Sequence, residues 1–434
     1  MTINRIQIAK SAQFDNHRSL ITARNVKSNT KMQWVVVKTE KGTFHAIEST
    51  CSHSGGPLHL GDIEDSNTIV CPWHEYRFEL KNGTSSTCPL FSVDVLPVFV
   101  KCDENNDEFV SVELSDDWEL VETQLFTYTK HSCLIKEEER IVPEDSRNGC
   151  FENICKGANL VEVAVDILNT LNPAQKVLKT FKASELWLNG DLIVGPTEVK
   201  PPSIPPREDN LGFVDPRNAP KRGKGGSAES RIAILHSLAN IEQWAIDLAW
   251  DMIARFSQTQ TLNSLTNEMQ PLPTSFLTDF VRMAFEEAKH FSFLVDRLKA
   301  HGAQFGDLKV HAGLWDSARD TKDSVLARLA IVHMVHEARG LDVNPNTIEK
   351  FRRAGDNDSV EKLTKIHQDE ITHVATGQRW FSWICSVSNL DRYVTFHDLV
   401  KLHFSGLLKP PFNAEDRLKA GLDPQYYMPL TKVK

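Results

Sequence analysis

Residues 51–74 read CSHSGGPLHLGDIEDSNTIVCPWH, and this stretch decides the fold of the N-terminal domain. It holds two short motifs, Cys51-Ser-His53 and Cys71-Pro-Trp-His74, each with one thiolate and one imidazole. Two thiolates can hold one iron of a [2Fe–2S] cluster while two imidazoles hold the other. Zinc is the alternative, but zinc fingers usually group cysteine with cysteine and histidine with histidine. The mixed pairs therefore predict a [2Fe–2S] cluster. Its ligands are Cys51, His53, Cys71 and His74.

The sequence around these motifs is rich in short β-strands. Runs such as QWVVVKT (33–39) and TFHAIES (43–49) are separated by turns, which is typical of a β-sandwich or barrel. The stretches CSHSGGPLHLGDI (51–63) and VCPWHEYRFELKNG (70–83) resemble a Rieske ferredoxin. The resemblance covers about the first 115 residues and implies an all-β domain that transfers one electron at a time.

The loop residues imply the lower-potential subtype of that family. The respiratory subtype has a disulfide between its two loops, at the positions of Gly56 and Trp73 in this chain, and a serine at the position of Tyr76. Because the chain lacks these groups, the resemblance implies the ferredoxin or oxygenase subtype. Glu75 departs from the family, which usually has glycine there. Its carboxylate would lower the potential further or affect docking.

From Ser227 onward the sequence changes to long helical patterns. The predicted helices run from about Ser230 to Phe256, from after Pro273 to near Gly302, from about Thr321 to Asp342, and from near Ser359 past Cys385. Pro345 is expected to lie beyond the end of the third helix. Long helices with moderate connections predict a four-helix bundle.

The apolar stripe of each predicted helix contains a glutamate. These residues are Glu242, Glu287, Glu337 and Glu370. Two of them begin Glu-x-x-His motifs that end at His290 and His373, so each acid shares a helix face with its histidine. Buried carboxylates are costly unless they are paired or bound to metal. Exposed acids and unrelated core histidines are the alternative, but they do not explain why every one of these side chains falls on a stripe.

This set of residues matches the ligands of ferritin-like di-iron carboxylate proteins. By that resemblance one metal ion is held by Glu242, Glu287 and His290, and the other by Glu337, Glu370 and His373. Glu287 and Glu370 would bridge the two ions. The resemblance implies iron, with manganese as the alternative.

Two further acids stand directly before the motif glutamates. Bacterial multicomponent monooxygenases have an aspartate at this place, which bonds the metal-ligating histidine of the opposite helix. By this resemblance Asp369 orients His290 and Glu286 orients His373, although a surface position is the alternative for Glu286. His333 in the third helix is expected to be a packed or supporting histidine, with an extra ligand as the alternative.

The region from about residue 155 to the end resembles a ferritin-like family of unknown function. The similarity rests on LHSLANIEQWAIDLAWD (235–251), EEAKHFSFL (286–294), HAGLWD (311–316), EARGLDVNP (337–345), DEITHVATGQRWF (369–381) and PPFNAEDRLKAGL (410–422). It implies the fold and no particular substrate.

The length of 434 residues predicts more than one domain. We expect a Rieske domain at 1–115, a connector with short helices and a Pro/Gly-rich segment at 116–226, and a bundle with a C-terminal extension at 227–434. The net charge of −9 offers no basic field for nucleic acid. No apolar run approaches the roughly 20 residues of a membrane helix, and the start has no signal-peptide pattern, so a cytoplasmic location is expected.

These features predict a di-iron oxygenase or oxidase with a fused Rieske electron donor. It would hydroxylate, desaturate or N-oxidise a small organic substrate with O2. Because the chain has no G-x-G-x-x-G or P-loop motif, a separate NAD(P)H-dependent reductase is expected.

A rubrerythrin-like peroxide reductase is the alternative, favoured by Leu341, where methane-type hydroxylases carry threonine. A ferroxidase or iron-binding protein would leave the Rieske domain unexplained. A homo-oligomer is plausible, since a Rieske domain can serve a neighbouring subunit.

Overall fold

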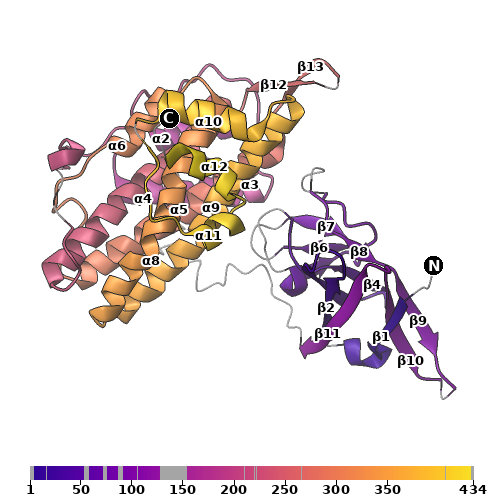
Figure 1. Cartoon of the computed structure of the whole chain (residues 1–434). Helices are drawn as coiled ribbons and strands as arrows, with labels where there is room; N and C mark the ends of the chain where they lie inside the picture. Colours follow the sequence, from indigo (N-terminus) through magenta and orange to yellow (C-terminus); the bar gives the residue numbers. More distant parts are fainter. Residues whose placement is uncertain are drawn as a thin grey trace. The chain divides into compact units, whose positions relative to one another are not determined.

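The computed structural model describes residues 4–15, 17–52, 58–71, 76–86, 91–104, 106–127, 154–209, 211–218, 220, 222–264, 266–405 and 407–431. The chain divides into two compact units, Met1–Ile141 and Val142–Lys434 (Figure 1). Within the described residues, no helix has the length and apolar character needed to cross a membrane.

The N-terminal unit consists of antiparallel β-strands. The strands are β1 (Asn4–Lys10), β2 (His17–Asn25), β3 (Lys31–Lys38), β4 (Phe44–Glu48), β5 (Asp62–Glu64), β6 (Thr68–Val70), β7 (Arg77–Glu79), β8 (Val95–Leu96), β9 (Val98–Cys102), β10 (Glu108–Leu114) and β11 (Trp118–Thr127). The largest sheet has the order β11-β2-β3-β4-β8, and two smaller sheets have the orders β1-β10-β9 and β5-β6-β7. The predicted all-β fold is confirmed, and β11 extends the largest sheet beyond residue 115.

Strand β3 lies between two apolar cores. Val35 and Val37 pack in the core that also contains Cys51 and Cys71, whereas Val36 packs in a second core on the other side. Successive side chains of a strand point to opposite faces, so a run of valines buries both faces of β3.

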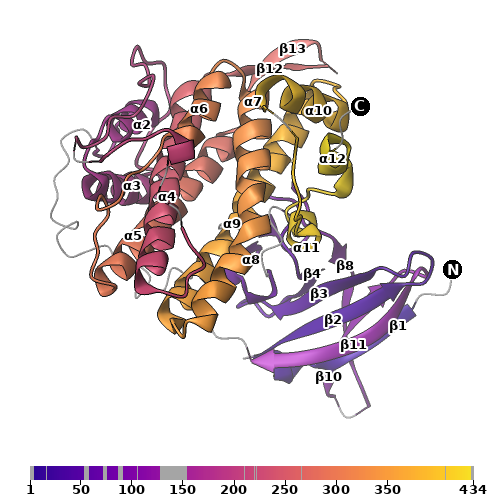
Figure 2. The same cartoon turned by 60° about the vertical axis from the view of Figure 1, so that its left-hand side comes forward.

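The second unit is helical, as predicted. Its helices are α2 (Leu160–Leu168), α3 (Pro173–Leu188), α4 (Ala228–Phe256), α5 (Thr274–Ala300), α6 (Gly313–Asp320), α7 (Val325–Arg328), the π-helix η4 (Leu329–His336), α8 (Glu337–Arg353), α9 (Asn357–Val387), α10 (Arg392–His403), α11 (Ala414–Lys419) and α12 (Pro424–Tyr427). A short hairpin of β12 (Gln260–Asn263) and β13 (Glu268–Pro271) joins α4 to α5. Helices α4 and α5, the continuous rod α7-η4-α8, and α9 form a bundle (Figures 1 and 2).

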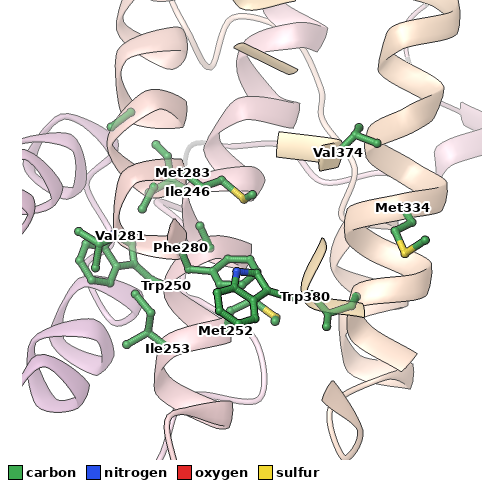
Figure 3. Close-up of a cluster of buried hydrophobic side chains, with 14 of the residues drawn as sticks. Ile246, Trp250, Met252, Ile253, Phe280, Val281, Met283, Met334, Val374 and Trp380 are labelled. Carbon is green, nitrogen blue, oxygen red and sulfur yellow. The ribbon is translucent and has the colours of Figure 1, made fainter. Parts of the chain in front are cut away.

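The long helices begin where the sequence offers caps. The side chain of Ser227 accepts a hydrogen bond from the amide of Ser230 at the start of α4, and Asp356 caps α9 through the amide of Ser359. The buried faces of the helices meet in a core that includes Trp250, Phe280 and Trp380 (Figure 3). This core packs the helices that carry the predicted ligands against one another.

The third rod of the bundle differs from the prediction at its end. Helix α8 continues to Arg353 with Pro345 inside it, so the expected stop near Asp342 is wrong. Proline has no N–H to donate to the carbonyl four residues earlier, which belongs to Leu341. The side-chain amide of Asn413 donates to that carbonyl at 3.3 Å. A contact from a distant segment therefore compensates for the missing backbone bond.

The predicted Pro/Gly-rich connector lies against the bundle as an extended segment. The indole of Trp315 donates to the carbonyl of Ser203 at 2.9 Å, and Arg255 donates to the carbonyl of Pro202 at 2.9 Å. Arg207 pairs with the fully buried Asp247 of α4. Three separate anchors therefore fix the segment to this unit.

Candidate metal centres

The two cysteines of the N-terminal motifs are buried in one core. Cys51 follows β4 and is 1% exposed, and Cys71 follows β6 and is 0% exposed. The amide of Cys71 donates to the carbonyl of Tyr76 at 2.8 Å, which closes the loop that leads into β7. The predicted ligands His53 and His74 lie outside the described residues, as do Gly56, Trp73 and Glu75.

In the helical unit the predicted ligands converge from four helices. Glu242 lies on α4, Glu287 and His290 on α5, Glu337 on α8, and Glu370 and His373 on α9. Ligand atoms of Glu242, Glu287, His290 and Glu370 all lie within 4.8 Å of one another. Every one of these residues is buried apart from Glu337, which is partly buried at the first position of α8. Glu337 lies close enough to Glu287 and Glu370 for these acids to affect its pKa.

The His290 ring is held from both sides. Its Nδ1 lies 3.2 Å from Glu287 Oε2 and 3.6 Å from Glu242 Oε2. Its Nε2 lies 3.1 Å from Asp369 Oδ2 on the opposite helix α9. A proton on Nε2 that is donated to Asp369 leaves the Nδ1 lone pair directed at the two glutamates.

The His373 ring repeats this arrangement with the helices exchanged. Its Nδ1 lies 3.0 Å from Glu287 Oε1 and 3.8 Å from Glu370 Oε2, and its Nε2 lies 2.8 Å from Glu286 Oε2 on α5. These are the pairings of Asp369 with His290 and of Glu286 with His373 that the sequence led us to expect. Glu286 is only 19% exposed at its side chain, so the surface alternative does not describe it.

Burial and mutual repulsion perturb the acids. Burial, followed by repulsion from Glu287, raises the pKa of Glu242 to about 8 and that of Glu337 to about 7. The same two causes hold the pKa of Glu370 well above its usual range. Burial would also raise the pKa of Glu287, but the facing His373 and His290 hold it well below its usual range. If all these acids were ionised they would repel one another, so without metal the group retains protons, and bound cations would replace those protons.

Several atoms of this group fit a bound metal. In the described part of the chain, Glu287 Oε1 and His373 Nδ1 contact each other at 3.0 Å, and the buried Glu370 Oε2 has no hydrogen-bond partner. Buried polar atoms normally have one. Carboxylate oxygens and imidazole nitrogens also suit iron and related cations. The residues present therefore fit a metal pair held by this donor set.

The π-helix η4 is a feature that the sequence did not indicate. It directly precedes Glu337 and contains His333, whose side chain is fully buried. Neither ring nitrogen of His333 has a hydrogen-bond partner among the described residues. Burial, followed by repulsion from Arg328 and His373, lowers the pKa of His333 to about 3, so the ring is neutral at pH 7. π-Helical turns often occur at functional sites.

Comparison with known proteins assigns both parts of the chain. Residues 169–428 match the family described as "Protein of unknown function (DUF455)". The chain belongs to the DUF455 family. Residues 15–88 match the family described as "Soluble Rieske-type ferredoxin". This DUF455 protein therefore carries a Rieske-type domain at its N-terminus, fused to a member of a ferritin-like family, as the sequence resemblance implied.

Individual relatives match one part or the other. An uncharacterised protein of Haemophilus influenzae is 34% identical over 226 residues, which cover 51% of this chain and 76% of that protein. A Rieske domain-containing protein of Homo sapiens is 56% identical over 52 residues, or 11% of this chain and 33% of that protein. The 3-phenylpropionate/cinnamic acid dioxygenase ferredoxin subunit of Shigella boydii is 34% identical over 71 residues, or 16% of this chain and 65% of that protein. The Rieske domain of this DUF455 protein supports a [2Fe–2S] cluster and electron transfer.

Proposed function

We propose that this chain is an O2-dependent oxidoreductase in which the helical unit holds two iron ions and the Rieske domain supplies their electrons. The cluster would be held by Cys51, His53, Cys71 and His74. The iron pair would be held by Glu242, Glu287, His290, Glu337, Glu370 and His373. When bound, such a pair supplies the two-electron chemistry that activates O2 for hydroxylation, desaturation or N-oxidation of a small organic substrate.

One observation carries the proposal, the reciprocal pairing of two Glu-x-x-His motifs with acids on opposite helices. In each motif the far nitrogen of the histidine faces an acid, at 3.1 Å from Asp369 and at 2.8 Å from Glu286. The near nitrogens face the carboxylates of Glu287 and Glu370, and Oε2 of Glu370 is buried without a hydrogen-bond partner among the described residues. A merely structural ion-pair network would gain nothing from leaving this buried oxygen without a partner.

The roles of the chain's own residues follow from this geometry. Asp369 and Glu286 hold a proton at each Nε2 and so keep each Nδ1 available as a ligand. Glu287 contacts both histidines, through Oε2 to His290 and Oε1 to His373, as a bridging carboxylate should. Burial of all the proposed ligands except Glu337 limits their access to water and strengthens their electrostatic interactions.

Electrons must enter from another protein. The Rieske domain carries one electron at a time, and its dioxygenase ferredoxin relative is named as a subunit of a larger system. We infer that a separate NAD(P)H-dependent reductase reduces the cluster.

A rubrerythrin-like peroxide reductase is the second candidate. Leu341 lies one turn after Glu337 and is fully buried, so this place offers no hydroxyl to a bound oxygen species. Reducing the purified protein and then adding O2 or peroxide separately distinguishes the two functions. O2 uptake that is slow alone and accelerated by one compound from a metabolite panel supports the oxygenase. Rapid oxidation by peroxide with sluggish reaction with O2 supports the peroxide reductase.

Substitution of Glu287 tests the iron pair itself. Because it contacts both histidines, Glu287→Ala should lose the iron of the helical unit while the visible spectrum of the cluster stays intact. Glu361→Ala is the matched control, since Glu361 lies on α9 with its side chain 74% exposed. The iron content and the visible spectra of the two variants show whether the helical unit needs Glu287 to hold iron. Full iron content and full activity in Glu287→Ala would refute the proposed site.

A further inference from the structure

A second feature of the helical unit is a cavity of about 330 Å³ lined by residues of η4, α8, α11 and the segment that joins α10 to α11. Its walls are largely apolar and include Val335, Phe404, Leu407, Leu408 and Phe412. The volume is at the lower end of the range of about 300–1,000 Å³ that is typical of small-molecule sites. Among the described residues that line it, there is none of the proposed metal ligands.

Basic residues outnumber acidic residues in the lining of the cavity. Arg339, Lys409 and Arg417 face a single acid, Asp342. Arg417 and Asp342 satisfy each other through two bonds of 2.8 and 2.7 Å, and both side chains are buried. The lining therefore carries excess positive charge from Arg339 and Lys409.

Arg339 is held in place by only one of its nitrogens. Its Nη1 donates to the carbonyls of Lys409 and Pro411 at 3.0 and 3.2 Å and lies 3.5 Å from Asp342 Oδ2. Its Nε and Nη2 make no hydrogen bond to a described residue, and the side chain is 46% exposed. Arg417 uses the same two groups, Nε and Nη2, to bind the carboxylate of Asp342. The Arg339 guanidinium is thus held in place by Nη1, while its Nε and Nη2 remain free to bind a carboxylate of a ligand.

We propose that this cavity binds a small monocarboxylate with an apolar chain or ring. Arg339 receives the carboxylate in the fork that Nε and Nη2 form, Lys409 adds a second positive charge, and the leucine and phenylalanine side chains cover the apolar part. Bare phosphate would leave those walls in water, and a neutral alcohol would leave the charges unmatched.

Part of the site comes from two of the stretches on which the family resemblance rests. Arg339 and Asp342 belong to EARGLDVNP, while Phe412 and Arg417 belong to PPFNAEDRLKAGL. These stretches are far apart in the sequence, and they meet at this cavity, at its buried ion pair and at the hydrogen bond from Asn413 to Leu341. The proposal does not depend on the metal centre, so either one can fail alone.

Calorimetric titration of the full-length protein with octanoate, 1-octanol and inorganic phosphate tests the chemistry. We expect saturable binding of one octanoate per chain and at least tenfold weaker binding of 1-octanol and phosphate. Phosphate that binds as tightly as octanoate would overturn the apolar part of the proposal. Octanol that binds as tightly would overturn the role of the arginine. No heat of binding with any probe would overturn the site.

Two variants locate the binding. Arg339→Gln should weaken octanoate binding at least tenfold, which corresponds to about 1.4 kcal/mol at 25 °C. Leu407→Asp leaves Arg339 and its hydrogen bonds to backbone carbonyls in place. It puts a second negative charge beside the bound carboxylate, so it should weaken octanoate binding at least tenfold. This variant therefore tests the site even if Arg339→Gln disturbs the segment. Arg352→Gln is the control, because Arg352 lies on the same helix with its side chain 56% exposed and outside the cavity. Wild-type affinity in Leu407→Asp, or an equal loss in Arg352→Gln, would refute the proposal.

Discussion

Gly377 allows η4 and α9 to approach each other beside the proposed iron site. A methyl group at this position would lie 2.6 Å from Cβ of His333 and 2.9 Å from the carbonyl oxygen of His333. His333 is fully buried against the ring of Phe280, at 5.0 Å between centroids, so it has little room to move. Gly377→Ala should therefore destabilise the protein by about 1–3 kcal/mol, which outweighs the gain of up to about 1 kcal/mol in helix propensity. Urea unfolding measures the difference.

Gly340 provides the control for that substitution. It also lies within a helix, but a methyl group there would meet only the side chain of Asn344, at 3.8 Å. Gly340→Ala should leave stability unchanged or raise it by up to about 1 kcal/mol. If both substitutions stabilised the protein equally, the close contact between η4 and α9 would be wrong.

We expect Glu286 to contribute to the proposed site through its contact with His373 and not as a ligand. Removing its carboxylate in Glu286→Ala frees the His373 ring to rotate and leaves Nε2 without its partner. We expect the iron affinity of the helical unit to fall roughly 10–100-fold. The spectrum of the [2Fe–2S] cluster should not change. Iron retention during dialysis against a chelator measures the effect, with Glu361→Ala again as control. Wild-type retention in Glu286→Ala would show that the contact is incidental.

The loop after α5 is joined to α4 through a histidine that acts as an acceptor. Nε2 of His236 accepts hydrogen bonds from the amides of Gly306 and Leu308, at 2.9 and 3.3 Å, and Phe305 stacks on the ring. A proton on Nε2 would face two donors and break both bonds. The contact therefore orders this loop only while the imidazole is neutral.

Acid should weaken this contact in a defined pH window. Burial lowers the pKa of His236 below its ordinary value of 6.5, against an opposing effect of Asp307. Below about pH 6.5 the unfolded chain binds a proton that the folded chain does not, so folding stability falls as the pH falls. The loss is at most about 1.4 kcal/mol for each pH unit. Urea unfolding between pH 7 and pH 5 should show a shallower decline for His236→Gln than for the wild type. Equal declines would contradict this account.

The sequence predicted the helical elements well where the decisive contacts are local. Helix α4 begins at Ala228 and α9 at Asn357, each within two residues of the predicted start, because a capping side chain stands just before them. The end of α8 could not be predicted in this way. The amide that compensates for Pro345 comes from Asn413, which lies far away in the sequence.

The proposed site likewise has parts that the sequence could predict and parts that depend on distant contacts. The spacing of Glu287 and His290 places both side chains on one helix face, so their convergence with Glu242 and Glu370 could be read from helical periodicity. The π-helical turn before Glu337 has no such signal, because it is set by how the rod packs between its neighbours. The cavity beside Arg339 depends on a C-terminal segment with no periodic pattern, and for that reason it could not be predicted.

The whole chain joins a one-electron carrier to a site proposed for two-electron chemistry. Each unit has its own core, so each cofactor can be lost while the other unit keeps its fold. Covalent fusion generally raises the effective concentration of a donor at its acceptor, to the order of millimolar where the linker is short and flexible. Reduction of the helical unit by its own Rieske domain should therefore not depend on protein concentration.

Mixing two inactive variants tests this consequence of the fusion. Cys71→Ser should lose the cluster and keep the helical site, whereas Glu287→Ala should keep the cluster and lose the helical site. The mixture can turn over only when one chain donates to another. At micromolar protein its activity should be far below that of the wild type and should rise with the concentration of Glu287→Ala, while wild-type activity per chain stays constant. A mixture as active as the wild type at every concentration would mean that electrons pass between subunits of a stable oligomer, and that the covalent connection is not what brings donor and acceptor together.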